Sequence, residues 1–337
     1  MSSDAIQIAK DEGIVEIKPR QGAEGFEITL TPHRSDLYVP RRSCQTRFPL
    51  ELIQYWLDRV SFASFCEVIG RHEETIPRAL KQHLFAYFAP EDFVGKRLLD
   101  FGCGSGASTF ALARMLPETE VMGVELAADR IEIANHVRSY LGLQNMEFRV
   151  SPSGDKLPPG IGEFDFVMLS AVYEHLLPVE RKTVMPLLWS AMKTGGVIFV
   201  NQTPYRYSPY EAHSTGLWLV NYMPDGMAHW TVRHFAKQNL QINRSADWNV
   251  HLRGGLRGGT EKEIVQNLAS GEVSKAEVLQ PRQNGLRDRA DFWLSCTNPQ
   301  RLYLLKKFIA AFFRLADGVL GTMPALNLEV VVRKLRP

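Results

Sequence analysis

The chain carries the stretch Arg97-Leu98-Leu99-Asp100-Phe101-Gly102-Cys103-Gly104-Ser105-Gly106, and this stretch decides the fold. Its first five residues are typical of a buried strand. The three glycines that follow let the backbone turn tightly and approach a ligand without a Cβ in the way. Residues 106–116 then predict a helix that ends before Pro117, and the N–H groups at its start would point at the same place. The stretch therefore predicts a strand, a ligand-binding loop and a helix.

Strands and helices alternate regularly after this unit. Apolar runs and helical spacing predict strands at 121–125, 146–150, 164–170 and 197–201 and helices at 128–141 and 180–193. Such alternation with short connections is typical of an α/β fold whose parallel sheet is covered by helices on both faces. Right-handed crossovers place the carboxyl end of every strand at one edge of the sheet, and ligands bind there, near the switch in strand order.

The pattern divides the chain into four segments, with bounds at 1–95, 96–203, 204–300 and 301–337. The first predicts a hairpin or two edge strands and then helices, at 13–31, 49–63 and 76–89. We place that hairpin outside any core that the pattern identifies. The second segment is the alternating core. The third is rich in aromatic residues, Gly, Arg and His, and we interpret it as a lid-like, substrate-binding insertion over the ligand edge. The fourth predicts a helix and a strand that returns to the sheet.

Composition and charge narrow the classes of function. Of the 337 residues, 45% are hydrophobic and 23% are charged, which is ordinary for a globular protein with a sizeable core. The net charge of +2 argues against a dedicated nucleic-acid surface. The four cysteines show no C-x-x-C spacing, so no metal site is predicted. The polar N-terminus has no signal-peptide pattern, and charges interrupt the longest apolar stretches, so we expect a cytoplasmic protein without a transmembrane segment.

The glycine loop alone fits two kinds of cofactor. Gly102, Gly104 and Ala107 satisfy the dinucleotide fingerprint G-x-G-x-x-G/A, so a nicotinamide or flavin cofactor is one alternative. The acid before the first glycine favours S-adenosylmethionine (SAM), because Asp100 could accept from the SAM amino group and would repel a pyrophosphate. Glu125, at the end of the second strand, suits the ribose hydroxyls of either cofactor.

Several segments together resemble class I SAM-dependent methyltransferases, over about residues 96–203. The motifs are the glycine loop with Glu125, the strand 164–170 with Tyr173-Glu174-His175-Leu176, and 187–201 through the Gly195-Gly196 turn. The resemblance implies a Rossmann-like sheet of seven mostly parallel strands, methyl transfer as the reaction and SAM as the cofactor. The cofactor-binding residues that it implies are Asp100, Gly102, Cys103, Gly104, Gly106, Glu125, Leu126, Ser153, Gly154, Ser170 and Tyr173. For Ser153 and Gly154, a purely structural turn is an equal alternative.

Two histidines are candidates for the chemistry. The methyl group of a sulfonium is already activated, so positioning supplies much of the catalysis, and a hydroxyl acceptor also benefits from a general base. His175 follows the fourth strand at the ligand edge, although capping of the next helix is an alternative role. His213 lies in a polar and aromatic cluster that suits a sugar. The predicted substrate-binding residues are Tyr205, Arg206, Tyr207, Glu211 and His213, with a loop closed on itself as the alternative.

Three flanking segments, 46–49, 203–213 and 256–260, resemble a subgroup of methyltransferases encoded among polysaccharide and lipopolysaccharide genes. This resemblance implies O-methylation of a hydroxyl on a carbohydrate or another small molecule. N- or C-methylation of another metabolite and a SAM-binding regulatory or scaffold protein remain alternatives, because SAM motifs identify the donor and not the acceptor. A nucleic-acid partner is not expected, because the charge is balanced and no Asn/Asp-Pro-Pro-Tyr/Phe motif follows the fourth strand.

The predicted helix near the C-terminus, at about 299–316, is amphipathic. Two placements are open for its apolar face. It packs on the sheet, as such helices commonly do, or it makes peripheral contact with a membrane that carries a lipid-linked acceptor. The sequence predicts no oligomeric state.

Overall fold

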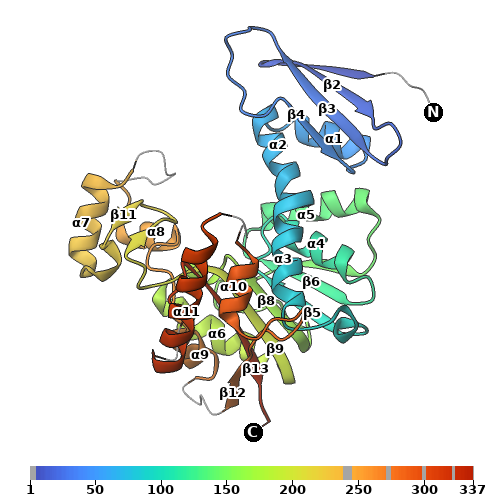
Figure 1. Cartoon of the computed structure of the whole chain (residues 1–337). Coiled ribbons are helices and arrows are strands. Elements are labelled where there is room, and N and C mark those ends of the chain that lie inside the picture. The colour runs from blue at the N-terminus through green and yellow to red at the C-terminus, as the bar shows by residue number, and fades with distance from the viewer. Residues whose placement is uncertain (1–4, 238–244, 271–274, 298–300, 321–322, 337) are drawn as a thin grey trace.

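The centre of the molecule is a seven-stranded sheet (Figure 1). The structure is a computed structural model that describes residues 5–237, 245–270, 275–297, 301–320 and 323–336. The sheet has the order β12-β13-β9-β8-β5-β6-β7. The strand bounds are β5 Arg97–Phe101, β6 Glu120–Glu125, β7 Met146–Val150, β8 Phe164–Ser170, β9 Met192–Pro204, β12 Ala276–Val278 and β13 Asn327–Lys334. β5 to β9 run parallel, and β13 runs antiparallel to β9 and β12. The predicted α/β fold with a mostly parallel sheet is therefore confirmed.

The strand order reverses between β5 and β8. The chain leaves β5 to build β6 and β7 on one side, and then returns to build β8 and β9 on the other. The connecting helices are α4 (Ala107–Met115), α5 (Ala128–Leu141) and α6 (Pro178–Ser190), close to their predicted ranges. The carboxyl ends of β5 and β8 therefore flank a switch point, which is where sheets of this kind bind ligands.

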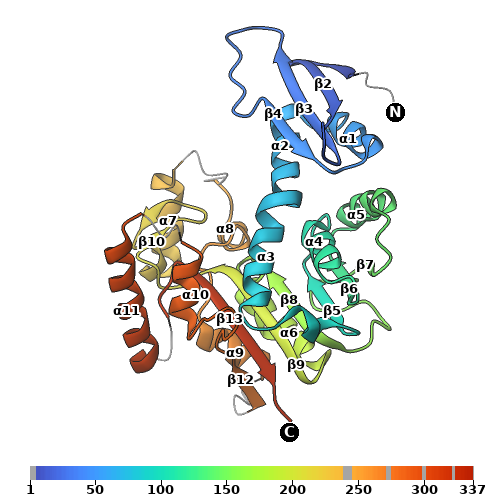
Figure 2. The ribbon, with the colours of Figure 1, turned by 45° about the vertical axis from the view of Figure 1, so that its right-hand side comes forward.

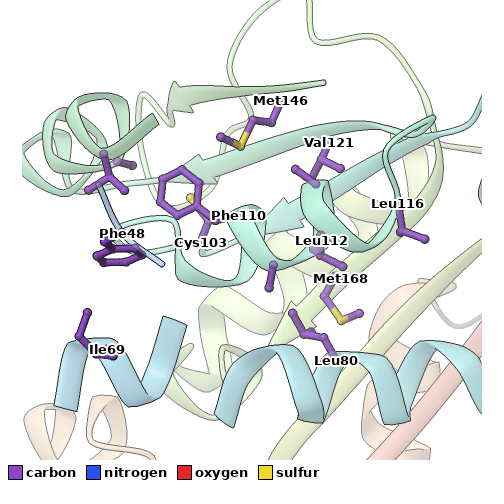
Figure 3. Close-up of a cluster of buried hydrophobic side chains, with 14 of the residues drawn as sticks. Phe48, Ile69, Leu80, Cys103, Phe110, Leu112, Leu116, Val121, Met146 and Met168 are labelled. Atoms are coloured by element: carbon purple, nitrogen blue, oxygen red, sulfur yellow. The ribbon is translucent and has the colours of Figure 1, made fainter. Parts of the chain in front are cut away.

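Helices cover both faces of the sheet because successive strand residues enter two different buried clusters. Leu98 and Met168 share a cluster with side chains of α3 (Ile76–Phe85), α4 and α5. Figure 3 shows Met168 in that cluster together with Leu80 of α3 and Leu112 of α4. Leu99 belongs to the second cluster, which contains side chains of α6 and α9 (Glu261–Leu268).

The N-terminal segment forms a four-stranded antiparallel sheet followed by three helices. The bounds are β1 Ile6–Lys10, β2 Gly13–Pro19, β3 Phe26–Pro32, β4 Ser43–Thr46, α1 Leu50–Leu57 and α2 Phe62–Gly70, and a π-helical turn at Arg71–Thr75 leads into α3. In Figures 1 and 2, α2 and α3 run between this sheet and the central sheet. The predicted hairpin is therefore part of a larger sheet, and its predicted placement outside the core is wrong. Val15, Ile17, Ile28 and Leu30 are almost fully buried in a hydrophobic cluster that also contains Phe48 and side chains of α1 and α2. These helices come later in the sequence than the hairpin.

The chain after Pro204 divides between a small helical lobe and the central sheet. The lobe contains β10 (Tyr210–Glu211), β11 (Leu217–Trp218), α7 (Asp225–Phe235) and α8 (Trp248–Arg253), which pack around a cluster of their own. α9 packs against α6, and β12 extends the sheet beyond β13. The predicted division into four segments remains a prediction, but two elements of the predicted insertion belong to the central layers.

The last helix, α11 (Tyr303–Leu320), packs beside α10 (Arg289–Ser295). Among its described side chains, Ala310, Phe313 and Ala316 are buried, so the side that packs inward is apolar. The first residues of the predicted helix, at 299–300, lie outside the described residues. Within the described parts of the chain, we find no helix whose length and hydrophobicity would let it cross a membrane.

Candidate active site

The glycine loop joins β5 to α4 in a conformation that its glycines permit. Gly102, Gly104 and Gly106 have φ angles of +74°, +55° and +92°, a region that other residues rarely adopt. A Cβ atom on Gly102 or Gly106 would come within 2.8 Å of a neighbouring side chain. A Cβ atom on Gly104 would meet only the end of Arg130, at 4.0 Å. The two outer glycines are therefore required by packing, whereas Gly104 faces the open side where a cofactor would approach.

Asp100 is buried at the carboxyl end of β5. Its Oδ2 accepts hydrogen bonds from the hydroxyls of Ser108, at 2.6 Å, and Thr109, at 2.7 Å. Burial raises the pKa of Asp100 to about 6, although the two hydroxyl bonds oppose this shift. One oxygen of this carboxylate thus holds α4 against β5. The predicted bond to the SAM amino group stays a prediction, and it would use the other oxygen.

Glu125 fastens the glycine loop to the end of β6. Its carboxylate accepts from the N–H groups of Gly104, at 3.0 Å, Leu126, at 3.0 Å, and Ala127, at 3.2 Å. The side chain of Leu126 is more than half exposed beside this group. Glu125 therefore lies next to the open face of Gly104, and its predicted contact with ribose hydroxyls stays a prediction.

The other predicted cofactor residues on this side have mixed placements. Cys103 is buried, and burial raises the pKa of its thiol above the ordinary value, so the side chain is a neutral packing group. Ser153 and Gly154 lie in the turn after β7, where Ser153 Oγ donates to Asp155 at 2.6 Å. The N–H of Ser151, just before this turn, donates to the carbonyl oxygen of Glu125 at 2.8 Å. The turn is therefore adjacent to the end of β6, as an adenine-binding loop would have to be.

Ser170 and Tyr173, two predicted cofactor residues near the end of β8, have different surroundings in the structure. Ser170 pairs with Asn201 at the carboxyl end of the strand, and Ala171 has a φ of +54°, which redirects the chain there. Tyr173 is fully buried. Its hydroxyl accepts from Asn267 at 3.3 Å, and the guanidinium of Arg181 lies 4.4 Å from the ring centroid. No part of the Tyr173 side chain is exposed to a ligand, so this predicted cofactor residue has a packing role.

Glu174, His175 and His213 form a compact cluster at the same edge. One ligand-type atom from each side chain lies within 4.8 Å of the other two. Glu174 is fully buried, whereas the side chain of His175 is 44% exposed. His175 Nδ1 lies 2.6 Å from the carbonyl oxygen of Arg253. A carbonyl can only accept, so Nδ1 carries the proton and Nε2 is left with a lone pair in the neutral ring. The structure thus brings together the two histidines that the sequence predicts from distant segments.

Thr203 completes this cluster, although it was not among the predicted site residues. Its hydroxyl donates to Glu174 Oε2 at 3.0 Å. The β9–β13 pairing shifts register here, and Gln202 has a φ of +60°, so a β-bulge interrupts the ladder next to the cluster. The sequence does contain a signal that could have identified Thr203. Three polar residues, beginning with the buried Asn201, follow one another at the end of an apolar strand.

Glu211 organises the loop that carries His213. Its carboxylate accepts from the N–H groups of His213, at 2.8 Å, and Thr215, at 2.5 Å, and from two hydroxyls of the same turn. The carboxylate is therefore fully occupied and 4% exposed. The structure gives Glu211 a positioning role for His213 and leaves no oxygen of it for direct contact with a substrate.

The remaining predicted substrate residues lie between β9 and the loop 253–260. Tyr205 is mostly buried, and its neighbour Arg206 donates its N–H to the carbonyl of Gly259 at 2.8 Å. The guanidinium of Arg206 donates to the carbonyl of Asn221, and burial lowers the pKa of Arg206. Tyr207 is 50% exposed. Of these three side chains, Tyr207 is the most accessible to an acceptor, so the substrate roles of Tyr205 and Arg206 stay predictions.

The middle of the chain is similar in sequence to known methyltransferases. Residues 92–244 match a family model described as a methyltransferase domain. The mitochondrial ubiquinone biosynthesis O-methyltransferase of Rattus norvegicus is 31% identical over 118 residues, which are 34% of this chain and 33% of that protein. The ubiquinone biosynthesis O-methyltransferase of Cereibacter sphaeroides is 28% identical over 146 residues, or 42% of this chain and 56% of the relative. The chain thus spans about a third to somewhat over half of the length of these two relatives.

Two further similarities are weaker. The ribosomal RNA small subunit methyltransferase G of Bacteroides thetaiotaomicron is 25% identical over 142 residues, covering 42% of this chain and 65% of that protein. Among solved structures, the plantazolicin methyltransferase BpumL in complex with SAH aligns over 85% of this chain and 94% of its own, with 14% identity and a TM-score of 0.43. The matched family model covers the glycine loop, Glu125 and the histidine cluster. Residues 92–244 of this chain therefore match a methyltransferase domain, and this match includes the predicted site.

Proposed function

We propose that this protein transfers the methyl group of SAM to a hydroxyl of a carbohydrate or another small-molecule acceptor. The observation that carries the proposal is the Glu174–His175–His213 cluster at the edge where the glycine loop opens. Val172, two residues before Glu174, is the side chain that a Cβ on Gly102 would strike, so the loop and the cluster are neighbours. An acceptor hydroxyl held at the cluster would lie next to the cofactor site.

His175 is the side chain best arranged to remove the hydroxyl proton. Its Nδ1–H is held by the carbonyl of Arg253, which leaves Nε2 as an acceptor. In the proposed step the acceptor oxygen bonds to the methyl carbon while the carbon–sulfur bond breaks, and the hydroxyl proton passes to Nε2. A polar acceptor is supported by the exposed ring of Tyr207 and by the exposed His213.

The experiment is a methyl-transfer assay with labelled SAM and fractionated cell extract. Label in carbohydrates or small metabolites supports the proposal, and identification of the methylated atom by NMR of the purified product separates O-methylation from N- and C-methylation. Label in RNA or protein would refute the proposed acceptor class. A protein that binds SAM and transfers nothing to any fraction would favour the regulatory alternative. His175→Ala should lower turnover at least 10²-fold, whereas His33→Ala, an exposed histidine of the N-terminal sheet, should leave it unchanged.

We further propose that the acceptor is met at an anionic membrane surface. The exposed side of α11 presents Leu304, Phe308, Phe312, Leu315 and Val319, each more than half exposed. Patches of this kind mark interaction surfaces. Lys306 and Lys307 lie in the first turns of the same helix and Arg301 lies just before it, and basic residues beside an apolar face suit anionic lipid headgroups.

Vesicle sedimentation tests this placement. Phe308→Glu should reduce binding to vesicles that contain anionic lipid, because it puts a charge on the exposed face. Val179→Glu changes an equally exposed apolar residue on α6 and should not reduce binding. If the protein does not bind vesicles and Phe308→Glu instead converts a dimer to a monomer, the face is a self-association surface and the membrane proposal is wrong.

The four cysteines are free thiols, which supports the expected cytoplasmic location.

A further inference from the structure

We propose that Glu174, His175 and His213 bind one divalent transition cation of the Zn²⁺ class. Their ligand-type atoms already lie within 4.8 Å of one another. Two imidazoles and one carboxylate are a ligand set that suits zinc and its neighbours, whereas Mg²⁺ and Ca²⁺ prefer oxygen ligands throughout. The sequence did not predict a metal here, because the ligands come from two segments 38 positions apart and no cysteine spacing announces them.

Glu174 supplies the clearest sign that a positive charge belongs in this cluster. Glu174 is completely buried, with 0% of its surface accessible to solvent. Oε2 accepts from Thr203, but Oε1 is buried with no hydrogen-bond partner in the described parts of the chain. A buried carboxylate with an unpaired oxygen is costly unless a cation or donor meets it. The unpaired oxygen lies 3.9 Å from His175 Nε2, so a cation between them would meet both.

His175 is oriented as a metal ligand would be. The hydrogen bond from Nδ1 to the carbonyl of Arg253, at 2.6 Å, fixes the ring and leaves a lone pair on Nε2, which lies 3.9 Å from Glu174 Oε1. In metal sites, a ligating histidine usually donates its other ring N–H to a carbonyl or carboxylate in this way. The same bond also serves a general base, so it does not decide between the two roles alone.

His213 is brought to the cluster by two separate devices. Glu211 holds the turn that carries it, through the N–H of His213 itself. On the other side, Gly255 has a φ of +90°, and a Cβ atom there would lie 2.6 Å from His213 Nε2 and 3.4 Å from Glu174 Cγ. Only glycine lets the backbone pass this close to both side chains.

The spacing allows an ion after a small closure. Ligand atoms about 2.1 Å from a tetrahedral ion are about 3.4 Å from each other, so the side chains would move inward by about 1 Å. His213 is exposed and can make this movement. Three protein ligands leave one coordination position open, as in catalytic zinc sites. If the proposed function holds, that position would take the acceptor oxygen and lower the pKa of its hydroxyl. The hydroxyl proton would then pass to water in the metal-bound form, and the base role proposed above for His175 Nε2 would apply only to the metal-free form.

The test is metal binding by the full chain after dialysis against a chelator. Zn²⁺ titrated by calorimetry should bind with a stoichiometry of one, and Co²⁺ should give the absorption of a four- or five-coordinate ion. His213→Ala should weaken Zn²⁺ affinity at least 100-fold, and Glu174→Gln should do the same while its thermal melt shows that it folds. His33→Ala is the matched control and should bind as the native chain does. Mg²⁺ at millimolar concentration should not displace Co²⁺.

Two results would overturn the inference. One is the absence of stoichiometric binding, and the other is binding that persists unchanged in His213→Ala, because the ion would then lie elsewhere. A separate titration with S-adenosylhomocysteine distinguishes this failure from failure of the proposed function. Cofactor binding and methyl transfer by the metal-free protein would leave the proposed function intact and reject the metal. Metal binding without cofactor binding would do the reverse.

Discussion

Gly102, Gly104 and Gly106 look alike in the sequence motif, but they have different roles in the structure. Gly102 and Gly106 leave no room for a Cβ, whereas Gly104 faces open space. The same distinction applies to neighbours elsewhere in the site. Tyr173 and Glu174 are both fully buried, yet the first fills the core and the second carries an unpaired oxygen. The sequence could predict that these segments form the site, because the motifs follow strand ends. It could not predict whether Tyr173 or Glu174 would face a ligand, because the chain turns just before them at Ala171, which has a positive φ.

Substitution at Gly104 and Gly106 tests this separation. We expect Gly104→Val to remove detectable binding of S-adenosylhomocysteine while lowering stability by only about 1–2 kcal/mol, the cost of a positive φ. Gly106→Val should instead lower the thermal midpoint strongly, because its side chain would collide with Phe110 and Phe148. Calorimetric titration and thermal unfolding of both variants provide the check. Normal binding by Gly104→Val would show that the cofactor does not approach this glycine.

Asp100 gives a prediction about pH. Its folded-state pKa of about 6 lies above the ordinary value of 3.8, so the folded state holds the proton more tightly. The resulting stability is fully present below about pH 4 and is lost as the pH rises through about 6. Between pH 4 and 7 the native chain should therefore lose up to about 3 kcal/mol relative to Asp100→Asn. Urea unfolding of both proteins at the two pH values measures this, and an unchanged difference would contradict the burial argument.

At the scale of elements, short loops and irregular backbone build the site. The β-bulge at Gln202 brings Thr203 to Glu174, the Glu211 turn carries His213, and the residues after α8 approach both. Regular periodicity predicts strands and helices, so it located β5 to β9 and their helices. It has no signal for a bulge or for a carboxylate that closes its own turn, and the insertion could therefore be predicted only as a polar cluster.

Gly255 tests whether the loop after α8 shapes the chemistry. We expect Gly255→Ala to displace His213 and to lower kcat at least 10-fold with little change in cofactor affinity. Gly285→Ala is a matched control, because Gly285 also has a positive φ, +77°, but a Cβ there meets nothing within 4 Å. Steady-state kinetics and calorimetric titration compare the two. Equal losses of activity in both variants would attribute the effect to backbone strain instead of to His213.

At the scale of the whole molecule, one core connects the sheet to the N-terminal helices. Phe166 and Phe199 of the sheet pack with Phe88 and Phe93, which lie between α3 and β5. The alternation of strands and helices predicted this central architecture. The N-terminal sheet was missed in part because its core is shared with helices far along the chain, and β12 was missed because a three-residue edge strand has too few positions to show a period.

The shared core predicts which substitutions lower the stability of the molecule most. Phe199→Ala should lower the free energy of unfolding by about 3–5 kcal/mol, because a fully buried aromatic ring is lost and leaves a cavity. Phe308→Ala removes a ring that is 73% exposed and should change stability by less than about 0.5 kcal/mol. Urea-induced unfolding of the two variants measures both values. Similar values for the two would contradict the buried placement of Phe199.

We infer that the glycine loop and Glu125 form a SAM site rather than a dinucleotide site. Calorimetric titration of the full chain with SAM, S-adenosylhomocysteine and NAD⁺ tests it most directly. We expect one equivalent of SAM or S-adenosylhomocysteine to bind, no heat of binding with NAD⁺, and loss of binding in the folded Gly104→Val variant. Stoichiometric binding of NAD⁺ without binding of either sulfur compound would contradict it.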